Sequence, residues 1–195
     1  MSLNLKIFMK NKIYFFLDRD GTIIHHVHYL RKVSNVKLYK FTIKALKILR
    51  KYGKIFVITN QSAVSRGLLK EKNLKKINNH VLKKINAKQK IIEKIFYCPH
   101  HTNAKIKKYR KDCIFRKPGV GFVKRFNNID KKKSWFIGDT NIDIKTGLNA
   151  NLNTILLKTG KKYKNDFKIT KSIMKCKNLY VAAKFIEKNL KIYVN

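Results

Sequence analysis

The residues with the clearest chemical potential are two aspartates, Asp18 and Asp20, which directly follow the apolar segment 13–17. Gly21 comes next, and a glycine lets the backbone turn so that both carboxylates face one small site. Two carboxylates together can divide the work of a nucleophile and of a general acid or base. Aspartate next to glycine is also common in turns that have no activity, so this pair alone leaves both interpretations open.

A second pair of aspartates, Asp139 and Asp143, lies at the end of another apolar segment. Carboxylate oxygens are the hard donors that Mg²⁺ prefers, although aspartate at a helix start can also act only as a cap. Thr59 and Asn60 add a hydroxyl and an amide, and Lys117 adds a cation. Together these groups would bind and polarise a phosphoryl group.

Alternating secondary-structure elements must position these residues. Short β-branched or aromatic runs predict strands at 13–17, 54–59, 94–98, 134–139 and 154–157, and apolar periodicity predicts helices at 41–52, 74–85 and 179–190. Such alternation is typical of βα units around a parallel sheet. Ligands bind beyond the carboxyl ends of the strands in such sheets, so the polar segments after the first, second and fourth strands predict one site.

The length of 195 residues suits one well-buried core, so we expect a single domain over residues 1–195. No apolar run reaches the roughly 18 residues that a membrane-spanning helix needs. Three cysteines fit a reducing compartment better than a disulfide framework. We therefore expect a soluble, cytoplasmic monomer with no membrane partner.

Four segments resemble the four motifs of the haloacid dehalogenase-like phosphatases: FFLDRDGTI at 15–23, VITNQS at 57–62, RKP at 116–118 and FIGDTNID at 136–143. The fuller pattern over residues 13–160 is similar to the family branch that hydrolyses a heptose 1,7-bisphosphate, with the histidinol phosphatases as the nearest alternative. The resemblance implies a three-layer, Rossmann-like α/β fold with a central parallel sheet and no large cap domain. It also implies Mg²⁺-dependent hydrolysis of a small sugar phosphate, in the synthesis of lipopolysaccharide.

The resemblance further implies a role for each matching residue. Asp18 would be the nucleophile that forms an aspartyl-phosphate, and Asp20 would be the general acid and base. Mg²⁺ would bind Asp18, the backbone carbonyl of Asp20 and Asp139, with Asp143 nearby. Thr59 and Lys117 would hold the phosphoryl group. The rest of the substrate would contact Asn60, Gln61, Ser62 and Arg116.

A zinc ion is the second metal that the resemblance implies, in the segment 98–118. Cys98, His100 and Cys113 match three of the family's four ligand positions, but the fourth is Phe115, which cannot bind a metal. Structural zinc is almost always four-coordinate, so a zinc site and an ion-free, packed loop both stay open. Either of two neighbouring residues, His101 or Asp112, could replace the missing ligand, or water could fill the position with weaker affinity.

Residues 21–38 would form a short flap over the site, and its three histidines, His25, His26 and His28, are expected to line the cleft rather than bind a metal. Thr140 stands where related enzymes commonly have a lysine that reaches the substrate. This difference bears on substrate affinity and leaves the catalytic residues intact.

The net charge of +37 would favour association with polyphosphates. Lysines are spread over the whole chain and outnumber arginines, whereas a phosphate-reading surface usually favours arginine. We therefore expect no specific nucleic-acid partner. A phosphatase for nucleic-acid 3′ ends and a basic binding module without catalytic activity remain as alternatives.

Overall fold

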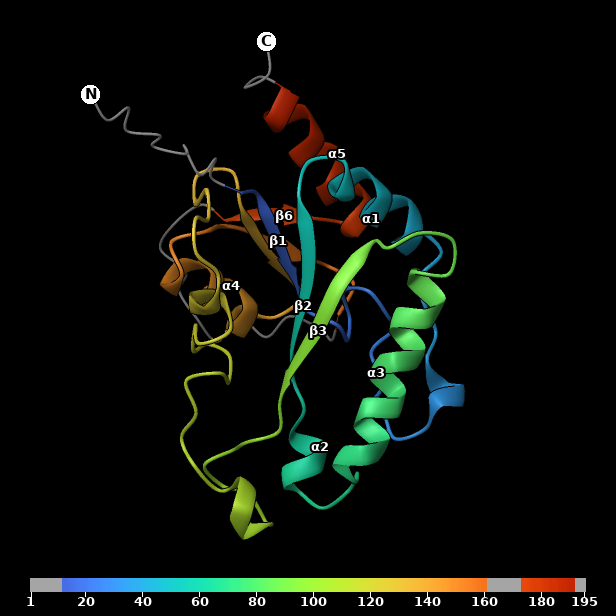
Figure 1. Ribbon diagram of the computed structural model, residues 1–195, viewed down its shortest axis with the longest axis vertical. Coiled ribbons are helices and arrows are strands. Elements are labelled where there is room, and N and C mark those ends of the chain that lie inside the picture. The colour runs from blue at the N-terminus through green and yellow to red at the C-terminus, as the bar shows by residue number, and fades with distance from the viewer. Residues whose placement is uncertain (1–11, 161–172, 192–195) are drawn as a thin grey trace, which may run out of the picture.

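The computed structural model describes residues 12–160 and 173–191 (Figure 1). Six strands form one parallel sheet in the order β3-β2-β1-β4-β5-β6. The strands are β1 (Tyr14–Leu17), β2 (Lys54–Asn60), β3 (Ile92–Cys98), β4 (Trp135–Gly138), β5 (Asn153–Leu157) and β6 (Met174–Cys176). The chain order reverses between β1 and β4, and ligands bind at such a switch point in open α/β sheets.

Helices cover both faces of the sheet, which gives three layers. In Figure 1, α1, α3 and α5 lie on one side of the strands and α4 lies on the other. The helices are α1 (Thr42–Arg50), α2 (Ser62–Ser65), α3 (Glu71–Ile85), α4 (Asn141–Asn149) and α5 (Leu179–Lys191), with 3₁₀ turns at Val33–Asn35, Lys107–Tyr109 and Val123–Arg125. The predicted three-layer, Rossmann-like α/β fold is thereby confirmed.

The central strand β1 is buried on both faces, as parallel strands usually are. Phe15 and Leu17 belong to the apolar cluster that includes α1, α3 and α5, whereas Tyr14 and Phe16 belong to a smaller, aromatic cluster on the opposite face. Alternate side chains of a strand point to opposite faces, so β1 is anchored from both sides. Residues 18–20 consequently leave the sheet from a rigid point.

The predicted elements are present with shifted ends. The third strand begins two residues earlier than expected, and the 41–52 helix is shorter at both ends. The pattern missed β6, a short strand with two exposed residues, and α2, and it indicated a helix start near Asp143 without giving bounds for α4. No large cap domain occurs within the described ranges. The expected domain over residues 1–195 includes segments outside those ranges and stays a prediction.

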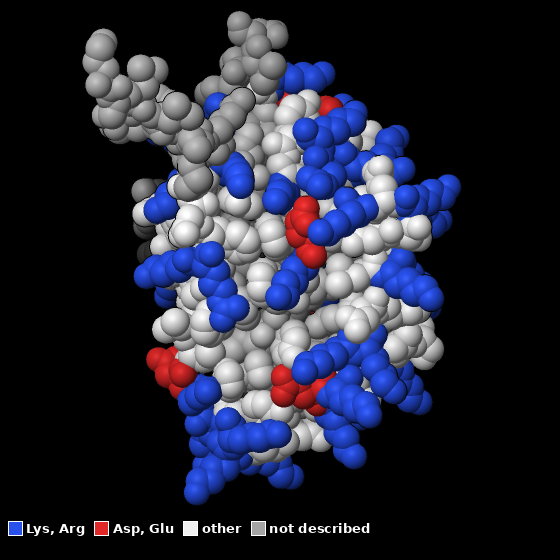
Figure 2. Space-filling view, viewed as in Figure 1, with Lys and Arg blue, Asp and Glu red and all other residues white. Residues whose placement is uncertain are grey.

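The surface carries basic side chains over the whole face seen in Figure 2, with no separate basic patch on that face. This distribution agrees with the even spread of lysine along the chain. Throughout residues 12–160 and 173–191, every helix falls short of the length and apolar character that crossing a membrane requires.

Candidate active site

The carboxyl ends of β1, β2 and β4 converge on one cavity of about 310 Å³. Asp18 follows β1, Thr59 ends β2, and Asp139 follows β4. All the predicted catalytic and substrate-binding residues line this cavity: Asp18, Asp20, Thr59, Asn60, Gln61, Ser62, Arg116 and Lys117. The structure thus brings together side chains, such as those of Asp18 and Asp139, that lie more than a hundred positions apart in the chain.

Lys117 connects two of the buried aspartates. Its Nζ donates to Asp18 Oδ1 at 2.7 Å and to Asp143 Oδ1 at 2.6 Å, and all three side chains are almost completely buried. Burial alone would lower the pKa of the Lys117 ammonium, but the carboxylates of Asp143 and Asp18 raise it above its usual value. Lys117 is therefore a permanent cation at the centre of the site.

The carboxylates of Asp18 and Asp139 are not fully balanced by this one cation. Burial, opposed by Lys117 and reinforced by Asp143 and Asp20, raises the pKa of Asp18 to about 7. Burial, together with repulsion from Asp18 and Asp143, raises the pKa of Asp139 to about 8. Three buried carboxylates around one ammonium leave negative charge that a further cation would neutralise.

The oxygen atoms around this charge fit a magnesium ion. The carboxylates of Asp18, Asp139 and Asp143 have one oxygen each within 4.8 Å of one another. Asp143 has its oxygens engaged by Lys117 and Thr140, so Asp18 and Asp139 are the better ligands. Gly21 has φ of +81°, and a Cβ on it would overlap the Asp139 carboxylate. A glycine at position 21 therefore keeps space open beside the oxygens.

Magnesium is expected to stabilise the chain more strongly as the pH rises from 5 to 8.5. The carboxyl pKa values of Asp18 and Asp139 are raised in the folded state. The folded chain then binds more protons than the unfolded chain, so stability falls as the pH rises towards about 8. Magnesium bound by the ionised carboxylates would oppose this loss. Thermal unfolding at both pH values, with Mg²⁺ and with chelator, tests this; an effect of Mg²⁺ independent of pH would contradict it.

The position of Asp143 has a local cause. Thr140 is the N-cap of α4, and its backbone N–H and hydroxyl both donate to Asp143 Oδ2, at 3.0 Å and 2.6 Å. The Asp143 backbone N–H contacts the Thr140 hydroxyl in return. This reciprocal capping box fixes one carboxylate oxygen and points the other at Lys117. Asp143 thus acts both as a cap and as the partner of Lys117.

The four predicted substrate-binding residues also hold the site together. The Asn60 side chain clamps the backbone of Lys117, accepting from its N–H and donating to its carbonyl, both at 3.0 Å. Gln61 Nε2 donates to Asp20 Oδ2 at 3.0 Å and to Thr59 Oγ1 at 2.9 Å. These contacts position three of the predicted catalytic residues, Asp20, Thr59 and Lys117.

Arg116, from the segment before Lys117, donates to the Ser62 hydroxyl at 3.2 Å and to the backbone carbonyl of His100 at 2.9 Å. It therefore joins α2 to the segment that follows β3.

Arg19 is a site residue to which the sequence pattern assigned no role. Its guanidinium is 1% exposed and contacts both carboxylate oxygens of Asp20, with the shortest distance at 2.8 Å. The only sequence feature that could have indicated a role for Arg19 was its place between two aspartates. The burial of Arg19 depends on α3, which is distant in the chain.

The flap over the cavity contributes two of the three histidines that were expected to line it. His26 and His28 line the cavity, and His25 packs against Tyr39 with ring centroids 3.9 Å apart. Among the described residues, the groups of His, Cys, Asp and Glu that could hold a metal do not include these histidines.

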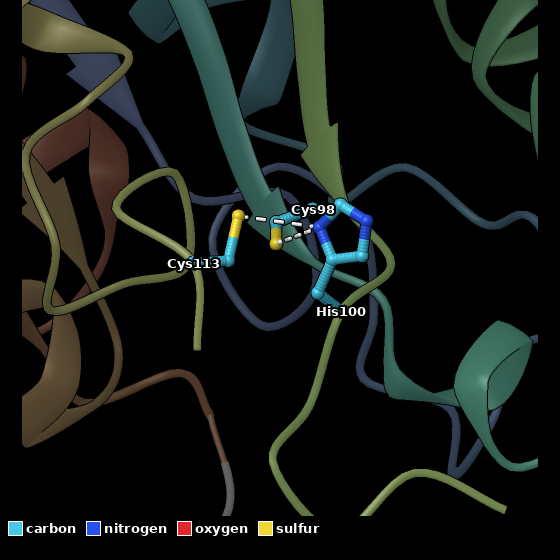
Figure 3. A group of neighbouring side chains, drawn as sticks. All are labelled: Cys98, His100 and Cys113. Atoms are coloured by element: carbon cyan, nitrogen blue, oxygen red, sulfur yellow. Dashed lines mark hydrogen bonds between the residues drawn. The ribbon is translucent and has the colours of Figure 1, made fainter. Parts of the chain in front are cut away.

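Cys98, His100 and Cys113 converge beyond the end of β3 (Figure 3). His100 Nδ1 lies 3.2 Å from Cys113 Sγ and 3.7 Å from Cys98 Sγ. Thiolate and imidazole are the donor types that zinc takes, and the Phe115 ring packs against the Phe122 ring with centroids 4.8 Å apart.

The two possible substitutes for the fourth ligand have local partners. His101 Nδ1 accepts from the Asn103 backbone, and Asp112 accepts from the Cys113 backbone.

Hydrogen bonds that need no metal also hold the segment 98–118 in place. Tyr97 and Tyr109 both donate to the Glu71 carboxylate at 2.8 Å, and the Ile106 backbone N–H donates to the Ser65 carbonyl at 3.0 Å. The segment is thereby attached to α2 and α3.

Comparison with known proteins identifies the family. The chain is 34% identical over 177 residues to a D-glycero-alpha-D-manno-heptose-1,7-bisphosphate 7-phosphatase of Photorhabdus laumondii, covering 88% of this chain and 95% of that protein. The chain belongs to the heptose bisphosphate phosphatase family. A D-glycero-beta-D-manno-heptose-1,7-bisphosphate 7-phosphatase of Escherichia coli is 32% identical, over 75% of this chain and 79% of that protein.

Membership of this family makes the chain a phosphoric monoester hydrolase, as expected, and rejects the alternative of a binding module without activity. The HAD-hydrolase-like family model matches residues 114–182. The crystal structure of D,D-heptose 1,7-bisphosphate phosphatase from B. bronchiseptica, a complex with magnesium and phosphate, has the same fold. Its TM-score is 0.79 at 21% identity, over 91% of this chain and 99% of that chain.

Proposed function

We propose that this enzyme removes the C7 phosphate of D-glycero-D-manno-heptose 1,7-bisphosphate with Mg²⁺, in the route to ADP-heptose and the lipopolysaccharide core. The observation that carries this proposal is the contact of Lys117 with Asp18 inside a cavity that Asp20 and Asp139 also line. The relatives named above act on the same sugar bisphosphate by their names. The whole chain, residues 1–195, would act as one cytoplasmic, monomeric domain.

The first step is transfer of the phosphoryl group to Asp18. Lys117 occupies Asp18 Oδ1, and Oδ2 accepts no hydrogen bond from the described residues. Oδ2 is therefore the oxygen that attacks phosphorus while the bond to the sugar oxygen breaks. Asp20 gives its proton to that leaving oxygen.

The second step is hydrolysis of the aspartyl-phosphate. Asp20, now ionised, takes a proton from a water molecule whose oxygen attacks phosphorus, and Asp18 leaves as a carboxylate. The products are inorganic phosphate and the heptose 1-phosphate.

Two further residues stabilise the transferred phosphoryl oxygens. An ammonium has three N–H donors. Lys117 donates two of them to the carboxylates of Asp18 and Asp143, so the third remains for the phosphoryl group. Thr59 Oγ1 accepts a hydrogen bond from Gln61 Nε2, so the Thr59 O–H can donate to a phosphoryl oxygen. Bound Mg²⁺, held by Asp18, Asp139 and the backbone carbonyl of Asp20, would supply charge neutralisation for the phosphoryl oxygens.

A zinc ion on Cys98, His100 and Cys113 is a separate part of the proposal. Convergence of the three donors supports it, and Phe115 in the fourth position makes it a three-ligand site of lower affinity than a complete one. This ion has a structural role only, so the two chemical steps do not depend on it.

The proposed substrate is tested by comparing rates of phosphate release. The compounds compared are both anomers of heptose 1,7-bisphosphate, histidinol phosphate and a 3′-phosphorylated oligonucleotide. We expect Mg²⁺-dependent turnover that strongly favours the bisphosphate and that stops when the metal is chelated. Preference for histidinol phosphate or for the oligonucleotide would keep the chemistry and overturn the substrate. Turnover of the bisphosphate that persists in chelator would overturn the metal dependence.

A further inference from the structure

The general acid–base residue of the proposed reaction is held by a chain of contacts that starts outside the cavity. Asp20 Oδ2 accepts from Arg19 Nη2 at 2.8 Å, from Arg19 Nε at 3.2 Å and from Gln61 Nε2 at 3.0 Å. Asp20 Oδ1 accepts only from Arg19 Nη2, at 3.1 Å, among the described residues. The two oxygens are therefore unequal, and Oδ1 is the one with capacity for a proton.

Arg19 is in turn held by α3. Its Nη1 donates to Asn78 Oδ1 at 2.7 Å, the shortest contact of the guanidinium. Arg19 is 1% exposed and Asn78 is 4% exposed, so water does not compete for this bond. A side chain 59 positions further along the chain thus fixes the group that orients Asp20.

Asn78 is an unusual residue for its position. The other buried residues of α3 are all apolar: Leu74, Ile77, Val81 and Ile85. The Asn78 Nδ2 atom is buried and has no partner among the described residues, and an orphaned buried donor costs stability. A leucine would avoid that cost, so the value of the asparagine lies in its oxygen, which faces Arg19.

We propose that Asn78 is a positioning residue for the acid–base step: it anchors Arg19, which holds Asp20 so that Oδ1 exchanges the proton. The inference rests on the proposed function, because Asp20 must be the acid and base. Oδ1 gives its proton to the sugar oxygen as the phosphorus–oxygen bond breaks, and later takes one from the attacking water. Misplacement of such a group by about 1 Å can cost about a hundredfold in rate.

The test is an Asn78→Leu variant, assayed on heptose 1,7-bisphosphate and on p-nitrophenyl phosphate. The sugar leaving group needs protonation, whereas p-nitrophenolate leaves without it, and kcat/KM reports phosphoryl transfer to Asp18. We expect kcat/KM to fall about tenfold or more for the bisphosphate, and less than about twofold for the aryl ester. An Asn78→Asp variant keeps an oxygen towards Arg19 and should recover most of the loss.

Val81→Ala is the matched control, since Val81 lies on the same buried face of α3, one turn away, and its apolar side chain offers Arg19 no hydrogen-bond partner. It should lower the melting temperature and leave the ratio of the two kcat/KM values unchanged. Equal losses on both esters, no loss in Asn78→Leu, or the same change of ratio in Val81→Ala would each overturn the proposal. A wild-type enzyme that hydrolyses neither ester would instead overturn the proposed function on which this inference rests.

Discussion

Asp18→Asn is expected to abolish phosphate release, with a loss of about a thousandfold or more in kcat. The amide has the shape of the carboxylate but is not a nucleophile, so no aspartyl-phosphate forms. The fold should remain, and its melting temperature in chelator at pH 8 should rise. Burial and the neighbouring carboxylates raise the pKa of Asp18, so its ionised form is unfavourable in the folded state.

Phosphate release and thermal unfolding, measured on the same preparation, check this result. Asp130→Asn is a matched control because Asp130 is an aspartate outside the cavity whose oxygen caps a turn, a contact that the amide retains. Full activity of the Asp18→Asn enzyme would be incompatible with the proposed mechanism.

Lys117→Met is expected to destabilise the enzyme by about 3–5 kcal/mol, the usual effect of removing one partner of a buried ion pair. Methionine approximates the volume of the lysine stem but leaves the Asp18 and Asp143 carboxylates without their cation. The loss should be larger at pH 8 than at pH 5, because protonation of Asp18 relieves the repulsion at low pH. Activity should also disappear, since Lys117 binds the phosphoryl group in the proposed reaction.

Chemical denaturation at the two pH values measures this loss, and Lys124→Met, at an exposed position, should change stability by no more than about 0.5 kcal/mol. Combining Lys117→Met with Asp143→Asn should cost less than the sum of the single changes, because the two side chains interact directly at 2.6 Å. Additive effects would show that the contact contributes nothing to stability.

The sequence by itself determined the fold class, the main strands and the position of the chemistry along the chain. Apolar runs alternate with amphipathic segments because a buried parallel strand and a one-sided helix need different side-chain patterns. The polar residues directly after these runs, such as Asp18, Thr59 and Asp139, had to lie at one edge of the sheet. The candidate site could be predicted from the chain alone because the strand ends carry most of the residues that line the cavity.

Only the tertiary structure decided which partner each of these side chains has. Lys117 contacts Asp18 and Asp143, and Arg19 contacts Asn78, across separations of 26 to 99 positions. Local propensity and periodicity describe neighbours within a few residues, whereas these contacts depend on how α3, α4 and the segment 98–118 pack on the sheet. The same reason explains why the pattern missed β6, a short strand that pairs only at the sheet edge.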